Sequence, residues 1–143
     1  MSLLKKIVPV HRILLQTLVL VLLMTSTFCA SGTMSAENDF IGTWTGHTKQ
    51  NDDPVDLTVE LDKGQISCEF HYGAPSNCSL MGKKDKMEGN TLRFRINESS
   101  GGRKCDNLWN GTIILVMQNK NKLEAQIKDK NNKLEDEAIL EKQ

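Results

Sequence analysis

Apolar side chains recur at every second position in several short stretches of this chain. The clearest stretch is Val55–Leu61, and the pattern returns at 92–96 and 123–127. Successive side chains of a β-strand point to opposite faces, so this alternation predicts strands with one buried face. Residues 113–117 are apolar throughout and rich in β-branched types, which predicts a strand buried on both sides.

Turn-forming residues separate these stretches at regular intervals. Glycine, asparagine and proline supply the backbone conformations that tight hairpins need. They gather at 62–64, 73–76, 89–90, 99–102, 110–111 and 131–132. The chain is therefore predicted to be all-β: an antiparallel up-and-down meander of about eight strands, forming a small barrel or barrel-like sandwich.

The C-terminal segment, 122–142, is open to two interpretations. Its apolar residues also fit a helical spacing of four, and its composition is rich in good helix formers. A polar break at Lys130–Asn132 instead favours two strands joined by a turn. In that interpretation Leu134, Ala138 and Leu140 lie on the buried face of the last strand.

The N-terminal segment, 1–36, has the order of charges and apolar residues that is typical of a secretory signal peptide. Basic residues precede the apolar run 13–24, small polar residues follow it, and acidic residues are absent. The run is shorter than the roughly 20 residues that a membrane-spanning helix needs. We expect cleavage between 29 and 36, a single domain at 37–143, no membrane span after signal removal, and a secreted or periplasmic location. Lipid attachment at Cys29 is an alternative, although the preceding Phe28 is larger than such sites prefer.

Three cysteines remain after the predicted signal, and an exported domain of this size can use a disulfide. Their odd number allows one internal bridge and leaves one thiol. The sequence favours Cys78–Cys105, with Cys68–Cys78 as the alternative if the two face each other across a hairpin at 73–76. The cysteine spacings differ from those of zinc sites, so no metal site is predicted.

The segment Gly42–Thr43–Trp44 opens the predicted domain and resembles the first strand of lipocalins, avidins and related up-and-down barrels. The resemblance implies that Trp44 closes one end of the barrel and packs against a basic side chain from a late strand. Small secreted bacterial domains of this kind combine Trp-x-Gly with two later cysteines, and Trp44–Gly46, Cys78 and Cys105 look like that pattern. The aromatic residues of an avidin biotin pocket are missing, so biotin binding is not implied.

The net charge and the absence of known motifs argue against nucleic-acid binding and against catalysis. Residues 37–143 carry 15 basic and 18 acidic side chains, and a net charge of −3 without a basic stripe argues against a nucleic-acid partner. Motifs of hydrolases, phosphate-binding loops and zinc proteases are absent, and His47 and His71 stand outside any catalytic pattern. The prediction is a non-catalytic protein without a cofactor.

The predicted function is an exported, lipocalin-like binding domain for an unidentified ligand. If the ligand is small and apolar, the candidate lining residues are Phe70, Tyr72, Phe94 and Trp109. The alternative is a protein-interaction module of the cell envelope, an inhibitor or a component of a surface complex, that binds through loops such as 99–106.

Overall fold

The computed structural model describes residues 37–143 as eight strands and two short helices. The predicted signal peptide and Cys29 lie outside the described residues. The 3₁₀ helix η1 (Glu37–Phe40) comes first, and the helix α2 (Arg103–Asp106) lies between the fifth and sixth strands. The strands are β1 (Gly42–Thr48), β2 (Pro54–Asp62), β3 (Gln65–Tyr72), β4 (Cys78–Glu88), β5 (Thr91–Ser100), β6 (Thr112–Asn119), β7 (Lys122–Lys128) and β8 (Leu134–Lys142).

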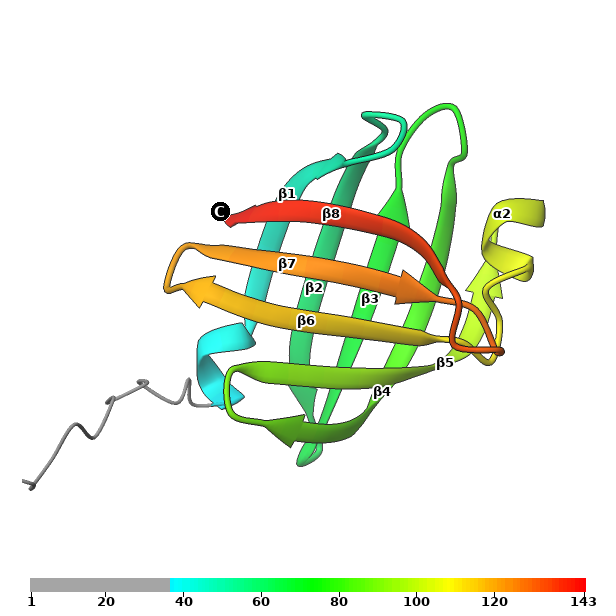
Figure 1. The fold of residues 1–143 in the computed structure, drawn as a ribbon. Helices are drawn as coiled ribbons and strands as arrows, with labels where there is room; N and C mark the ends of the chain where they lie inside the picture. Colours follow the sequence, from blue (N-terminus) through cyan, green and yellow to red (C-terminus); the bar gives the residue numbers. More distant parts are fainter. Residues whose placement is uncertain (1–36) are drawn as a thin grey trace, which may run out of the picture. The chain divides into compact units, whose positions relative to one another are not determined.

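Each strand pairs antiparallel with the next, and β8 pairs with β1, so the sheet closes into a barrel (Figure 1). The closing register places Gly46 opposite Leu140 and Thr48 opposite Ala138. The predicted all-β meander is confirmed. The C-terminal segment forms β7 and β8, so the helical alternative is wrong there; the Lys130–Asn132 break is the turn between the two strands.

Side chains fill the inside of the barrel. The inward face of every strand is apolar along most of its length, and large residues from different strands, such as Leu57, Phe70, Phe94 and Leu115, are completely buried. Burying a side chain of this size stabilises the fold by about 1.5–3 kcal/mol relative to leaving it in water. The alternation seen in the sequence is thus the alternation between the barrel interior and its outer surface.

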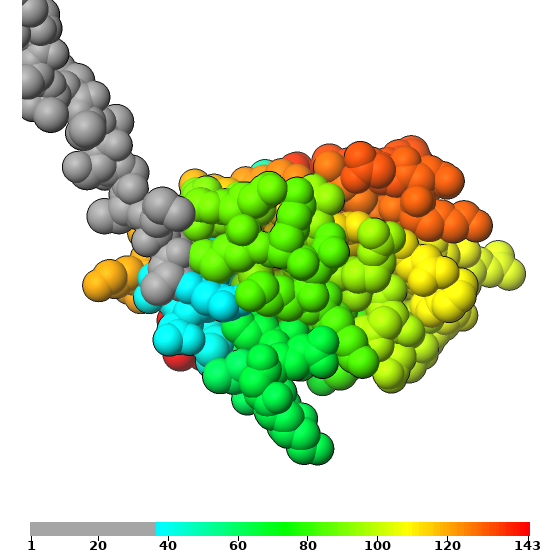
Figure 2. Space-filling view, turned by 90° about the horizontal axis from the view of Figure 1, so that it is seen from below, coloured from blue at the N-terminus to red at the C-terminus, as the bar shows by residue number. Residues whose placement is uncertain are grey.

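Two residues expected on the buried face are exposed. Leu61 is 55% exposed because it lies just before the turn of the β2–β3 hairpin, which projects beyond the barrel in Figure 2. Leu134 is 42% exposed because it begins β8 at a register shift opposite Lys128, outside the packed layers. In both cases the alternation of apolar and polar residues extends along the strand beyond the part that is packed in the barrel core.

The apolar run 113–117 forms the centre of β6, with Ile113, Leu115 and Met117 pointing inward. On its outer face Ile114 is also buried, whereas Val116 is only partly buried. Burial on both sides is therefore confined to Ile114, whose partners on the neighbouring strands are the long side chains Arg93 and Gln126.

One end of the barrel is closed by Trp44. Its side chain is fully buried, and its Nε1–H donates a hydrogen bond of 2.9 Å to the backbone oxygen of Phe40, the last residue of η1. The Nζ atom of Lys142, near the end of β8, lies 5.1 Å from the centre of the indole ring. Gly42 leaves room for that lysine, because a Cβ at this position would be 3.2 Å from its Cε.

The disulfide joins Cys78, at the start of β4, to Cys105 in α2. This confirms the favoured pairing and excludes the alternative. In the β3–β4 hairpin Cys78 lies opposite Tyr72, whereas Cys68 lies opposite Gly82 and is free and buried in the core. The disulfide therefore fixes the β5–β6 connection to the barrel wall.

Replacing both bridged cysteines with serine is expected to lower the free energy of unfolding by about 3 kcal/mol, since the bridge closes a long loop of the unfolded chain. Urea unfolding of C78S/C105S measures the loss. Amide hydrogen exchange should accelerate most in 103–108, the segment that the bridge holds. Unchanged stability and unchanged exchange there would show that the bridge does not fix this connection.

Candidate functional site

Four connections gather at the end of the barrel opposite Trp44: those between β1 and β2, β3 and β4, β5 and β6, and β7 and β8. We call this end the mouth. An open cleft of about 850 Å³ lies between the connections. It is lined by Gln50, Asn51, Asp53, Pro75, Ser76, Lys104, Asn107, Leu108, Asp129, Glu135 and Asp136.

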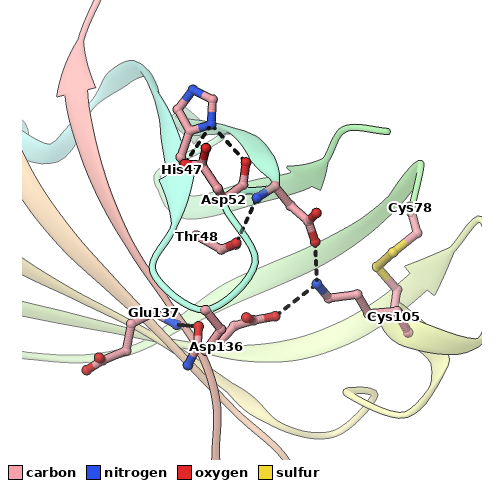
Figure 3. A network of polar contacts seen from close by, with 10 residues as sticks. His47, Thr48, Asp52, Cys78, Cys105, Asp136 and Glu137 are labelled. Atoms are coloured by element: carbon pink, nitrogen blue, oxygen red, sulfur yellow. Dashed lines mark hydrogen bonds and ion pairs between the residues drawn. A yellow bond between two sulfur atoms is a disulfide. The ribbon is translucent and has the colours of Figure 1, made fainter. Parts of the chain in front are cut away.

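A lysine at the mouth lies between two carboxylates, one of which is that of Asp136, labelled in Figure 3. The Nζ atom of Lys104 lies 3.1 Å from Oδ2 of Asp136 and 3.3 Å from Oδ2 of Asp53. The same nitrogen lies 4.1 Å from the centre of the Tyr72 ring, a cation–π contact. Asp136 is only 4% exposed, so the ion pair with Lys104 is needed to offset the cost of burying its carboxylate. We call these four residues the plug.

Each member of the plug is placed by a different part of the fold. Asp136 occupies an inward position of β8, two residues before Ala138. Asp53 ends the β1–β2 connection, where its N–H donates a 3.0 Å hydrogen bond to Oγ1 of the buried Thr48. Lys104 is carried by α2 next to the disulfide-bonded Cys105. The bridge therefore also positions the lysine.

The β1–β2 connection is further fixed to β8. The N–H of Lys49 donates to the backbone oxygen of Glu137 at 2.7 Å, and the N–H of Glu137 donates to Oε1 of Gln50 at 3.2 Å. His47 Nδ1 contacts the backbone oxygen of Asp52 at 3.1 Å. These bonds hold one wall of the cleft in a defined conformation without using the carboxylates that face the cleft.

Tyr72 lies beneath the lysine and is fully buried. Its hydroxyl has no hydrogen-bond partner of good geometry within residues 37–143. Burial, together with the negative charge of the nearby Asp136, raises the pKa of the Tyr72 phenol. The phenol therefore stays neutral and contributes its ring face to Lys104 rather than an ionised oxygen.

The candidate ligand-lining residues do not form one group. Phe70, Tyr72 and Phe94 point into the core, and the rings of Phe70 and Tyr72 meet edge to face at 5.1 Å. Trp109 lies in the β5–β6 connection, 50% exposed, with its Nε1–H directed at the backbone oxygen of Asn97 on β5. The first three are packed by neighbouring side chains, and the fourth lies on the outer surface.

Three members of the plug were not among the residues expected from the sequence: Asp53, Lys104 and Asp136. One signal was available. Asp136 falls on the same strand face as Ala138 and Leu140, and a carboxylate at an inward position requires a cation or a hydrogen-bond donor. The identity of that cation depends on α2 packing back over the mouth, which the local sequence does not indicate.

The fold and the mouth define the class of protein: an eight-stranded up-and-down antiparallel β-barrel with a polar mouth. No protein-family model matches the sequence, and no curated protein matches it. In the described part of the chain, no cluster of three or more histidine, cysteine or acidic side chains is arranged to hold a metal ion. None of the helices at 37–143 has the length and apolar character needed to cross a bilayer.

The free energy of unfolding is expected to fall at alkaline pH, because burial disfavours ionisation of the Cys68 thiol and the Tyr72 phenol in the folded barrel. Burial raises the pKa of the Cys68 thiol as well as that of Tyr72, whereas in the unfolded chain these groups titrate near 9.0 and 10.0. A folded-state pKa above the unfolded value gives stability that is complete below the unfolded pKa and is lost as the pH rises. Between pH 9 and pH 10 the two groups together should remove about 1.4 kcal/mol.

Urea unfolding at a series of pH values, with the C68A variant in parallel, tests this expectation. The difference between wild type and C68A isolates the thiol from the lysines that also titrate in this range. We expect C68A to be less stable at neutral pH but to lose less stability between pH 9 and pH 10. Parallel pH profiles would mean that the thiol is not shielded from ionisation.

Proposed function

We propose that this chain is an exported, non-catalytic binding domain that binds its partner at the mouth rather than inside the barrel. The observation that carries the proposal is the position of the plug. Lys104, Asp53 and Asp136 close the mouth above a filled interior, and the cleft lies outside them. This arrangement favours the protein-interaction alternative over a lipocalin-like carrier, which would need an emptied interior.

The charge of the cleft favours a partner with cationic groups. Four carboxylates line it, from Asp53, Asp129, Glu135 and Asp136. Lys104 pairs with two of them and Lys133 pairs with Glu135, so the four carboxylates outnumber their two cations. The pKa of Asp129 is lowered, chiefly by the backbone N–H of Lys133, so this carboxylate stays ionised. A lysine or arginine side chain of a partner protein fits a cleft of this sign.

Export is supported by the cysteine chemistry. A disulfide between β4 and the mouth persists outside the cytoplasm, where thiols oxidise. The signal-like segment 1–36 supports the same location on sequence grounds. The absence of catalysis is part of the proposal. In residues 37–143 no histidine, cysteine and acidic side chains are grouped to hold a metal ion. The one serine–histidine contact there, 3.0 Å between Ser79 Oγ and His71 Nδ1, joins β4 to β3, and neither residue lines the cleft.

The test compares two charge-matched variants. N51R/N107R places two arginines in the cleft. N121R/Q65R places the same charges at the closed end, in the β6–β7 turn and at the first residue of β3. Wild type and both variants are used to capture partners from the source organism, with captured proteins identified by mass spectrometry. The proposal expects one protein to be retained by wild type and N121R/Q65R and lost from N51R/N107R, at least tenfold, which corresponds to about 1.4 kcal/mol.

Two results would contradict the proposal that the partner binds at the mouth. One is equal retention of the protein by both variants. The other is a small apolar molecule that copurifies with wild type in native mass spectrometry and is lost when Phe70 and Phe94 are replaced by smaller apolar residues in a folded variant. That second result would restore the carrier interpretation, with the ligand inside the barrel.

A further inference from the structure

The outer face of the β4–β5 hairpin carries two pairs of cations. Lys83 lies directly opposite Arg95, and Lys86 lies directly opposite Arg93. The arginines point outward because their neighbours Leu92, Phe94 and Ile96 fill the core. The lysines lie within strand β4.

This concentration of charge is not neutralised within the described barrel. Like charges directly opposite each other across two strands destabilise a sheet. In residues 37–143, Lys86 forms an ion pair with Glu88, whose carboxylate also feels the charge of Arg93, whereas Lys83 and Arg95 form no ion pair. The arrangement therefore costs stability and leaves at least two cations available to an external anion.

Basic side chains outnumber acidic ones on the β4–β5 hairpin, with five cations against the carboxylates of Asp85, Glu88 and Glu98. In the closed sheet, β4 and β5 are opposite β8 and β1. Outward carboxylates also lie on β8, with Glu137 and Glu141, and on β2, with Asp56 and Glu60. Charges separated by more than a Debye length of about 10 Å are largely screened at 0.1 M salt. An anionic surface approaching β4 and β5 therefore meets local positive charge.

Exposed apolar side chains border the cations. Met81 is 36% exposed two residues before Lys83 on β4. The half-exposed indole of Trp109 is held at 3.4 Å to the backbone oxygen of Asn97, two residues after Arg95 on β5. Figure 2 shows the green β4–β5 hairpin as open surface, with the yellow segment that contains α2 adjoining it. Cations next to an exposed tryptophan are typical of surfaces that contact the interface of a bilayer.

We propose that this surface, formed by Lys83, Lys86, Arg93 and Arg95 with Met81 and Trp109, docks on an anionic lipid bilayer. The cations attract the phosphate groups of the headgroups, and the two apolar side chains enter the interfacial layer. The side chains project from one hairpin, at about 5 Å across strands and about 7 Å along them, so they can reach a flat array of headgroups together. None of these six residues lines the cleft, so this proposal does not rest on the partner at the mouth.

The experiment measures binding of the full-chain protein to vesicles of phosphatidylcholine alone and to vesicles in which about a third of the lipid is phosphatidylglycerol. The variant K83Q/R95Q removes one cross-strand pair, and K120Q/K122Q removes two exposed cations at the β6–β7 turn as a matched control. All proteins share residues 1–36, so any contribution of that apolar segment cancels in the comparison.

We expect binding to the anionic vesicles only, weakened by salt. Each Lys or Arg near such a surface is worth roughly fivefold in partitioning, so K83Q/R95Q should bind about 25-fold more weakly than wild type. The control should stay within about threefold of wild type, since distant charges are screened. W109A should also reduce binding, and brominated lipid should quench wild-type fluorescence through Trp109 more than it quenches the W109A variant, which retains the buried Trp44.

Three results would overturn the proposal: equal binding by K83Q/R95Q and the control, equal binding to both kinds of vesicle, or binding of a single-stranded oligonucleotide without binding to anionic vesicles. The last would assign the surface to a soluble polyanion. The variant K83E distinguishes misfolding from a lost contact with the bilayer, because it replaces the like-charge pair with Arg95 by an opposite-charge pair. This variant should unfold at the same or a higher temperature than wild type while binding more weakly than K83Q.

Discussion

Replacing Trp44 with alanine is expected to lower the free energy of unfolding by about 4 kcal/mol. The side chain is fully buried at the closed end of the barrel. Its removal leaves a cavity between η1 and the first core layer, frees the backbone oxygen of Phe40 from its hydrogen bond, and takes the ring from beneath Lys142. The loss combines the transfer of a large apolar surface with an unfilled space that the surrounding strands cannot close.

Urea unfolding measures this loss of stability. Two further variants, W109A and W44F, serve as a control and as a measure of the hydrogen-bond contribution. W109A removes the half-exposed tryptophan and should change stability by less than about 0.5 kcal/mol. W44F keeps most of the ring but leaves the Phe40 oxygen buried without its donor, which should cost about 1–2 kcal/mol. A loss for W44A as small as that for W109A would mean that the closed end does not depend on Trp44.

The strands with a strong local signal could be predicted, whereas β3 and β4 have no such pattern and follow only from the meander as a whole. Alternation at Val55–Leu61 and 92–96 reports which side chains face the barrel interior, and the turn residues between them limit the order to a meander. The same signal wrongly predicts that Leu61 and Leu134 are buried. Alternation shows which residues lie on one face of a strand, but it does not show how far along that face the packed core extends. The extent of the core is set by neighbouring strands, whose register depends on long-range pairing.

The closed end and the mouth differ in how much the sequence reveals. Trp44 lies in a recognisable Gly-x-Trp, and the resemblance to up-and-down barrels directs attention to a late-strand cation, the role that Lys142 has in the structure. The plug has no such motif. Asp53 comes from the β1–β2 connection, Lys104 from α2 and Asp136 from β8, and they meet because α2 is bound to β4 by the disulfide. Their proximity is a property of the closed barrel.

The plug leads to the second large effect. Replacing Lys104 with alanine is expected to lower the free energy of unfolding by about 3–5 kcal/mol, because it leaves buried carboxylates without their cation. Asp136 is almost fully buried and Asp53 partly so, and both approach the same lysine nitrogen. The matched control is K133A, which removes an exposed lysine paired with Glu135 and should leave stability unchanged.

The double variant K104A/D136N separates lost charge from lost packing. Without the lysine, the carboxylate of Asp136 is buried without a cation, and the cost of that unpaired charge makes up most of the expected loss. K104A/D136N, which also removes the buried charge, should therefore recover much of the loss at neutral pH. A deficit that is not reduced by D136N would instead assign the role of Lys104 to its contact with Tyr72.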